Sequence, residues 1–140
     1  MLLCFLDLDH MKHINDSYGH AEGDNALVSA AGILRKVFRA SDIIARWGGD
    51  EFVVLVRGAS LDQAETLATQ IRDAVADPID VGAATVQVEL TLGVAHSTTG
   101  VSEETLARSD HTMLGAKADA PGSIRRATAK RAGPEPDRAP

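Results

Sequence analysis

The chain has 140 residues, a length that predicts one domain with enough apolar side chains for a core without disulfides or structural metals. Hydrophobic residues make up 44% and charged residues 24%, which excludes a largely disordered, collagen-like or coiled-coil chain. The net charge of −6 argues against broad nucleic-acid binding, which requires a basic surface. Cys4 is the single cysteine, so an internal disulfide is excluded and a reducing compartment is indicated.

The first apolar run is too short to cross a membrane. Asp7 and Asp9 interrupt it well before the roughly 18 residues that a bilayer span requires. The run also lacks the basic leader and the small-residue cleavage site of a signal peptide. These features predict a cytoplasmic protein with no membrane segment.

Charge divides the chain unequally. Residues 121–140 carry five basic and two acidic side chains, a net charge of +3, so residues 1–120 carry −9. We therefore predict one folded domain over residues 1–120, followed by a disordered basic tail rich in Arg, Ala and Pro. Contact between this tail and an anionic partner is the less favoured alternative.

Hydrophobic periodicity predicts alternating strands and helices. Residues 2–8 are almost continuously apolar, as in a strand buried on both faces, and helices are expected over 10–18 and 23–39. Two β-prone runs, 43–47 and 52–56, flank a Gly-Gly pair and predict a tight hairpin.

The second half of the chain continues this order. A helix is expected over residues 61–77, where Pro78 ends it, and a half-buried strand over 85–95, where apolar and polar residues alternate. A last helix is expected over 102–118 with Ser102 as its N-cap. This order predicts an α/β fold, an α+β sandwich with a mixed, mostly antiparallel sheet and flanking helices.

Four carboxylates fall at the ends of predicted strands. Asp7 and Asp9 end the first strand, and Asp50 and Glu51 lie in the hairpin. If these strands are neighbours, the carboxylates repel one another unless a hard cation such as Mg²⁺ joins them, and such a cation usually also holds substrate phosphates. Phosphoryl or nucleotidyl transfer is then the expected chemistry. On the charge pattern alone, four solvated loop carboxylates are the simpler interpretation.

Four sequence blocks, in order, resemble one known family. Residues 48–52 (Gly-Gly-Asp-Glu-Phe) resemble the signature of the GGDEF family, whose active members are diguanylate cyclases. The blocks at residues 5–16, 18–24 and 91–95 resemble the family's first-strand, Gly-His-x-x-Gly-Asp and later-strand motifs. The resemblance covers about residues 2–118 and implies a fold like the core of nucleotidyl cyclases and the polymerase palm.

The resemblance implies a specific reaction. Two GTP molecules condense to the bacterial second messenger cyclic di-GMP, with release of pyrophosphate. The 3′-hydroxyl of one GTP attacks the α-phosphate of the other with the assistance of Mg²⁺ or Mn²⁺. Each domain holds one GTP, so the active unit implied is a transient homodimer.

Roles in catalysis and metal binding follow from the same resemblance. Asp7, the backbone carbonyl of Leu8 and the side chain of Asp50 are the implied metal ligands. Glu51 is expected to bind a second metal ion or to deprotonate the attacking hydroxyl, and Lys12 to offset the charge of the triphosphate.

The resemblance also implies the nucleotide contacts. Asn15 and Asp24 are expected to recognise guanine, because a carboxylate can accept hydrogen bonds from both N1–H and N2–H of that base. The phosphates are expected to contact the backbone N–H groups at the start of the first helix and two lysines; these residues are His10, Met11, Lys12 and Lys117.

An Arg-x-x-Asp motif precedes the hairpin. Arg39 and Asp42 match the family's inhibitory motif, which implies that the product cyclic di-GMP binds there and arrests the domain in a non-productive arrangement. The alternative is a helix-terminal arginine that simply pairs with a nearby aspartate.

Three features depart from the family pattern. The sequence lacks the upstream helix with its Asp-x-Leu-Thr-Gly-Leu-x-Asn-Arg motif, so we expect a truncated N-terminus with apolar surface exposed. Leu114 replaces a tyrosine, and Pro121 stands where a phosphate-binding arginine is usual. Two alternatives to the cyclase follow: a module that binds GTP or cyclic di-GMP and signals through a partner, and a truncated fragment that folds poorly.

Overall fold

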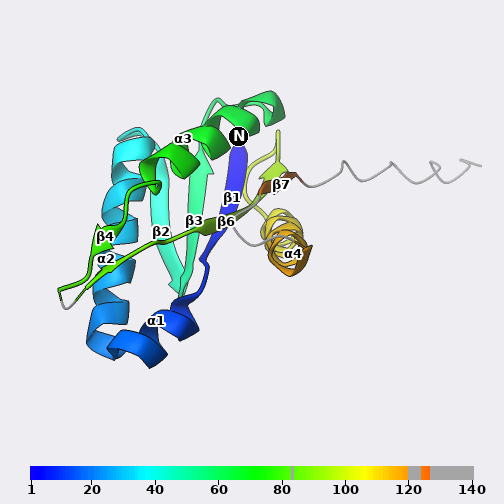
Figure 1. Ribbon diagram of the computed structural model, residues 1–140. Coiled ribbons are helices and arrows are strands. Elements are labelled where there is room, and N and C mark those ends of the chain that lie inside the picture. The colour runs from blue at the N-terminus through cyan, green and yellow to red at the C-terminus, as the bar shows by residue number, and fades with distance from the viewer. Residues whose placement is uncertain (83, 120–123, 127–140) are drawn as a thin grey trace, which may run out of the picture.

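The computed structural model describes residues 1–82, 84–119 and 124–126, which form one sheet with helices on both of its faces (Figure 1). In chain order, its elements are β1 (Leu2–Leu8), α1 (Met11–Tyr18), α2 (His20–Val37), β2 (Ile43–Gly48), β3 (Glu51–Val56), the 3₁₀ turn η1 (Leu61–Gln63), α3 (Ala64–Ala74), β4 (Ile79–Asp80), β5 (Thr85–Val86), β6 (Leu90–His96), α4 (Glu103–Asp119) and β7 (Ile124–Arg126).

Strand β1 is the centre of the five-stranded sheet, whose order is β2-β3-β1-β6-β7. It pairs antiparallel with β3 and with β6, while β7 pairs parallel with β6. All seven residues of β1 are buried, because helices cover both faces of the sheet at this point. The expected mixed, mostly antiparallel sheet with flanking helices is confirmed.

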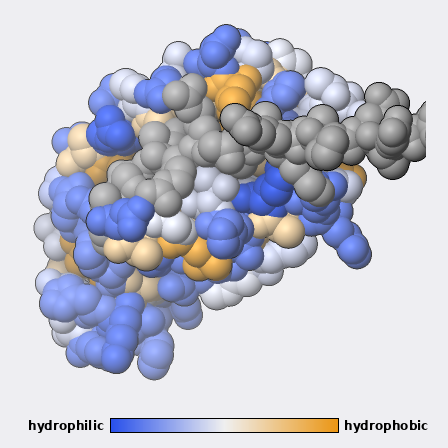
Figure 2. Space-filling view, turned by 90° about the vertical axis from the view of Figure 1, so that its right-hand side faces the viewer, coloured by the Kyte–Doolittle hydropathy of each residue, from blue (hydrophilic) through white to orange (hydrophobic). Residues whose placement is uncertain are grey.

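The two faces of the sheet bury different amounts of apolar surface. Helices α2 and α3 cover one face and enclose the larger core, which includes Leu6, Leu34 and Ile71. Helix α4 covers part of the other face, where a smaller cluster forms around Phe5 and Met113. Hydrophobic side chains appear on the α4 side of the molecule as small patches among hydrophilic ones (Figure 2).

The edge strand β2 leaves apolar side chains in contact with solvent. Trp47 packs edge-on against Phe5, with the ring centroids 6.0 Å apart, yet it remains 56% exposed. Ile43 on the same strand is 47% exposed. Solvent therefore reaches large apolar side chains at this edge of the sheet.

A glycine lets α4 lie directly on the sheet. A Cβ atom at Gly93 in β6 would collide with the backbone of Ser109 and Met113 in α4. Any larger residue would force the helix away from the strand. The helix begins as predicted, since the Ser102 hydroxyl accepts a hydrogen bond from the Thr105 N–H at 3.2 Å.

Some element boundaries differ from the prediction. The helix expected over 61–77 begins as the turn η1 and ends at Ala74, and the helix expected from residue 23 begins at His20. The strand expected over 85–95 divides into β5, which pairs with β4, and β6. Between them the Gln87 side chain donates a hydrogen bond to the Val75 carbonyl at 2.8 Å, so this stretch joins α3 rather than the main sheet.

The predicted tail contains a strand that the sequence did not reveal. Residues 124–126 form β7 along β6, where three residues are too few for a periodic signal. The remainder of the predicted tail, 121–123 and 127–140, lies outside the described residues, and so does Pro121. None of the helices in the described part of the chain has the length and apolar composition needed to cross a bilayer.

We predict that Gly93→Ala destabilises the fold by about 1–3 kcal/mol, because the added methyl group overpacks the contact between β6 and α4. Urea unfolding of the variant and the wild-type protein measures this difference. Gly32→Ala in α2 is the control, since a Cβ there meets nothing within 4 Å. We expect this variant to be more stable than the wild type by roughly 0.5–1 kcal/mol, because alanine reduces the backbone freedom of the unfolded chain. Equal stability of the Gly93→Ala variant and the wild type would refute the close-packing argument.

Candidate functional site

The predicted carboxylates meet where β1 ends beside the β2–β3 hairpin. Asp7 pairs with Glu51 in the β1–β3 register, and the Leu8 N–H donates a hydrogen bond to the Asp50 carbonyl at 3.0 Å. Asp7 and Asp9 are two residues apart and therefore point to the same side of the chain. Both are buried, at 8% and 1% exposure. The neighbouring strands that the sequence hypothesis required are therefore present.

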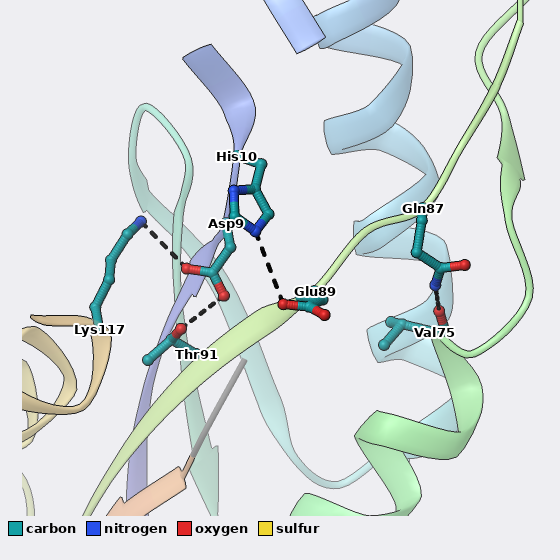
Figure 3. A network of polar contacts seen from close by, with 7 residues as sticks. All are labelled: Asp9, His10, Val75, Gln87, Glu89, Thr91 and Lys117. Atoms are coloured by element: carbon teal, nitrogen blue, oxygen red, sulfur yellow. Dashed lines mark hydrogen bonds and ion pairs between the residues drawn. The ribbon is translucent and has the colours of Figure 1, made fainter. Parts of the chain in front are cut away.

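Lys117 supplies the positive charge that these carboxylates face. Its Nζ lies 2.8 Å from Asp7 Oδ2 and 3.5 Å from Asp9 Oδ1. It extends from the last turn of α4, one helical turn beyond the point where Met113 packs on Gly93. The close approach of helix and strand thus brings an ammonium group to two buried carboxylates, of which Figure 3 shows Asp9.

Ionisation equilibria reflect this balance of charges. Burial raises the pKa of Asp7, and the charges of Asp50 and Asp9 add to that effect, while Lys117 opposes it. Burial lowers the pKa of Lys117, but its hydrogen bond to Asp7 and the two aspartate charges outweigh burial and leave that pKa raised. Lys117 is therefore held in its charged form by the carboxylates that it neutralises.

The surroundings of Glu51 raise its pKa. Partial burial and then the charges of Asp7, Asp110 and Asp50 raise its pKa above the ordinary glutamate value. A raised pKa favours a carboxylate that takes up a proton during a reaction. The sequence prediction of Glu51 as a deprotonating group is chemically consistent with this setting.

The first turn of α1 carries the residues predicted to bind phosphate. His10 has a left-handed backbone conformation, with φ of 65°, and α1 begins at the next residue, Met11. The His10 side chain is directed toward Glu89, with Nε2 of the ring 3.8 Å from Glu89 Oε2 (Figure 3). Lys12 is exposed on the same turn. A helix start with no side-chain cap and a nearby exposed lysine favours anions.

The predicted guanine ligands lie on adjoining helices. A Cβ atom at Gly23 in α2 would collide with the side chain of Asn15 in α1, so this glycine lets Asn15 contact the turn that carries Asp24. Asp24 also lines a cavity of about 460 Å³ between α2 and the hairpin, together with Leu27 and Arg46. That volume lies within the usual range for small-molecule sites.

Arg46 fixes the hairpin turn, a role that the sequence analysis did not assign. Its Nε and Nη2 both donate hydrogen bonds to the Gly49 carbonyl, at 3.1 and 2.8 Å. Gly49 precedes Asp50, so the guanidinium holds the turn on which Asp50 and Glu51 depend. An arginine three residues before a carbonyl in a Gly-Gly turn is the only sequence signal for this contact, and it is a weak one.

The Arg39–Asp42 motif lies at the opposite end of β3. The Arg39 N–H donates a hydrogen bond to Asp42 Oδ2 at 2.8 Å, and Arg39 Nη2 lies 3.6 Å from Asp42 Oδ1 and donates to the Arg57 carbonyl at 2.9 Å. This pairing matches the simpler of the two sequence interpretations. The Arg39 side chain is nevertheless 65% exposed, and with Gln63 it lines a second cavity.

The residues near Asp7 offer too few ligands to hold a divalent cation alone, so phosphate oxygens of a substrate would have to complete its coordination. Within residues 1–82, 84–119 and 124–126, no group of three or more His, Cys, Asp or Glu side chains is arranged to hold a metal ion. Asp7 Oδ1 is buried and accepts no hydrogen bond from the described residues, which leaves a negatively charged donor for a cation. Mg²⁺ is commonly held by one or two carboxylates together with substrate phosphates, and this donor set suits that mode.

Comparison with known proteins gives a consistent result. The family model "Diguanylate cyclase, GGDEF domain" matches residues 1–122. Diguanylate cyclase DgcM of Escherichia coli is 40% identical over 118 residues, which cover 84% of this chain and 28% of DgcM. This chain spans less than a third of the length of the curated relatives that it matches.

Solved structures show the same similarity. The GGDEF domain of PA1120 (YfiN or TpbB) from Pseudomonas aeruginosa is 38% identical, with a TM-score of 0.83, over 92% of this chain and 83% of that one. A microbial GGDEF domain described with cyclic di-GMP is 32% identical, with a TM-score of 0.75, over 89% of this chain and 75% of that one.

We predict that Lys117→Met lowers the free energy of unfolding by about 2–3 kcal/mol near neutral pH, because two buried carboxylates lose their opposing charge. The value stays below that of a fully buried pair because a third of the lysine side chain is exposed and solvent screens its charge. The pKa of Asp7 is already raised in the folded state, and loss of Lys117 raises it further. As pH falls, Asp7 in the folded variant therefore takes up a proton more readily than Asp7 in the unfolded chain. The difference in free energy of unfolding between the variant and the wild type becomes smaller as a result.

Urea unfolding at about pH 7 and about pH 5 measures this change. Lys36→Met, on the exposed surface of α2, is the control and should show little effect at either pH. A gap between the Lys117→Met variant and the wild type that is equal at both pH values would contradict the prediction.

Proposed function

This chain belongs to the diguanylate cyclase GGDEF domain family, and we propose that it joins two GTP molecules into cyclic di-GMP with release of pyrophosphate. One observation carries the proposal above all. The carboxylates of Asp7, Asp50 and Glu51 gather at the paired ends of β1 and β3, where Lys117 provides the opposing charge.

We assign Asp7, the Leu8 carbonyl and Asp50 as ligands of a Mg²⁺ or Mn²⁺ ion that arrives with the triphosphate. When bound, such an ion neutralises phosphate charge and favours ionisation of the attacking hydroxyl. Asp7 Oδ1 is the donor best placed for this role, because it is buried and without a hydrogen bond from the described residues. Glu51 takes the proton of the hydroxyl or holds a second ion.

The remaining residues orient the nucleotide. Asn15 and Asp24 bind the guanine edge, and the phosphates contact Lys12, Lys117 and the backbone N–H groups of His10 and Met11. The 3′-oxygen of one GTP forms a bond to the α-phosphorus of another, the bond to pyrophosphate breaks, and Glu51 receives the proton. A second such step closes the ring.

The reaction requires two copies of the domain. Each copy holds one GTP, so two sites must face each other in a transient homodimer. The product has a proposed second site at Arg39 and Asp42, where the exposed guanidinium can pair with a phosphate and stack on a base.

Incubation of the purified protein with GTP and Mg²⁺, followed by chromatographic detection of cyclic di-GMP, tests the function. We expect product from the wild type and none from Asp50→Ala, with Asp62→Ala on η1 as the active control. Folded protein that binds GTP or cyclic di-GMP without turnover would support the binding-module alternative. Folded protein that neither binds nor reacts would defeat both proposals.

We predict that Asp24→Asn reduces the preference for GTP over inosine triphosphate by about tenfold. Inosine lacks the N2 amino group, and an amide cannot accept hydrogen bonds from both N1–H and N2–H as a carboxylate does. Calorimetry with non-hydrolysable analogues measures both affinities. Asp73→Asn, the same change at an exposed position of α3, should keep the wild-type preference; an unchanged preference in Asp24→Asn would remove this residue from the guanine site.

A further inference from the structure

The Asp9 carboxylate is held from two sides. The Thr91 hydroxyl in β6 donates a hydrogen bond of 2.6 Å to Asp9 Oδ2, while Lys117 Nζ lies 3.5 Å from Asp9 Oδ1 (Figure 3). Asp9 is 1% exposed and Thr91 is fully buried. The Asp9 N–H also donates a hydrogen bond of 2.9 Å to the carbonyl of Glu89, the residue just before β6. Both the backbone and the side chain of Asp9 are therefore bonded to β6 or to the residue that precedes it.

Asp7 is held differently, although it lies two residues away. Its contact with Lys117 is the shorter one, 2.8 Å, but no hydroxyl of the described residues donates a hydrogen bond to its carboxylate. Thr91 is the register partner of Asp7 on β6, yet its hydroxyl bonds to Asp9. Asp9 is therefore the carboxylate that is held in place. Asp7 is the carboxylate that can exchange the Lys117 ammonium for another cation.

We propose that Thr91 and Asp9 are positioning residues of this site, which hold Lys117 beside Asp7 in the resting protein and keep it within reach when a magnesium–nucleoside triphosphate takes its place on Asp7. This inference rests on the proposed function for the identity of the ligand. The hydroxyl–carboxylate–ammonium chain itself does not depend on that function.

Electrostatics explains why such an arrangement works. A divalent cation and the Lys117 ammonium are both positive and compete for the Asp7 oxygens, so binding of the cation displaces the lysine. Asp9 still attracts Lys117 after this displacement. The Thr91 hydroxyl fixes the orientation of the Asp9 carboxylate, so this carboxylate does not turn toward the new cation on Asp7. The displaced ammonium then remains close to the incoming phosphates instead of moving into solvent, where its long side chain has many conformations.

Two substitutions at Thr91 separate the role of its hydroxyl from that of its volume. Thr91→Val keeps the shape and removes the hydroxyl, while Thr91→Ser keeps the hydroxyl. We expect kcat/KM for GTP to fall about tenfold or more in Thr91→Val and to stay within about twofold of wild type in Thr91→Ser, as is usual for residues that orient a charged ligand-binding group. Thr112→Val on α4 is the matched control, since that hydroxyl bonds only to the Arg108 carbonyl among the contacts described.

A spectroscopic readout tests the chain without any turnover. In protein with ¹⁵N-labelled lysine, we expect a protected Lys117 Nζ resonance in the wild type, Thr91→Ser and Thr112→Val, and its loss to solvent exchange in Thr91→Val. Addition of Mg²⁺ with a non-hydrolysable GTP analogue is expected to shift this resonance in the wild type. Circular dichroism establishes that each variant is folded.

Several results would overturn the proposal. A Thr91→Val variant with a protected Nζ resonance and wild-type kcat/KM removes Thr91 from the site. Bound analogue that leaves the wild-type resonance unchanged removes the exchange at Asp7. A wild-type protein that makes no cyclic di-GMP and binds no analogue defeats the proposed function, whereas the comparison of resonances in the unliganded variants still decides whether Thr91 and Asp9 position Lys117.

Discussion

The site depends on a charge balance that burial makes obligatory. Two carboxylates, Asp7 and Asp9, end a strand that is covered on both faces, and unpaired charges in that environment are strongly unfavourable. Lys117 satisfies them only because α4 lies against β6 without an intervening side chain at Gly93. One missing methyl group thus determines the helix position, and the helix position determines where the ammonium lies.

The same balance makes the site responsive to ligands. Lys117 neutralises the charge of Asp7 but leaves one Asp7 oxygen without a hydrogen bond from the described residues. Without a ligand, the charge of Asp7 is therefore balanced while its capacity to accept hydrogen bonds is only partly used. A cation that brings its own oxygen ligands can complete what a single ammonium cannot. The rigid parts are the strands and the hairpin turn, which Arg46 holds through the Gly49 carbonyl. In the proposed exchange, the part that moves is the Lys117 side chain.

Elements with a clear periodicity could be predicted from the sequence, and contacts between distant side chains could not. The buried strand β1, the hairpin around Gly48 and the Ser102 cap follow from local rules and are confirmed. The division at Gln87 depends on a hydrogen bond to Val75, and no alternating pattern records such a tertiary contact. Thr91 was noted only as part of a strand motif, because its partner Asp9 lies 82 residues away in the chain.

The positions of the two proposed sites constrain how one can affect the other. Asp50 precedes β3 and Arg57 follows it, so the carboxylate cluster and the Arg39 cavity lie at opposite ends of the same strand. Strands β1, β3 and β6 are paired along their lengths and largely buried, and both faces of β3 carry apolar side chains that pack in the two cores. A ligand at the proposed Arg39 site is therefore separated from Asp50 by the full length of a paired and largely buried strand. Under the proposed function, such a ligand acts on how two copies of the domain meet, a step that a reaction between two separately bound nucleotides requires.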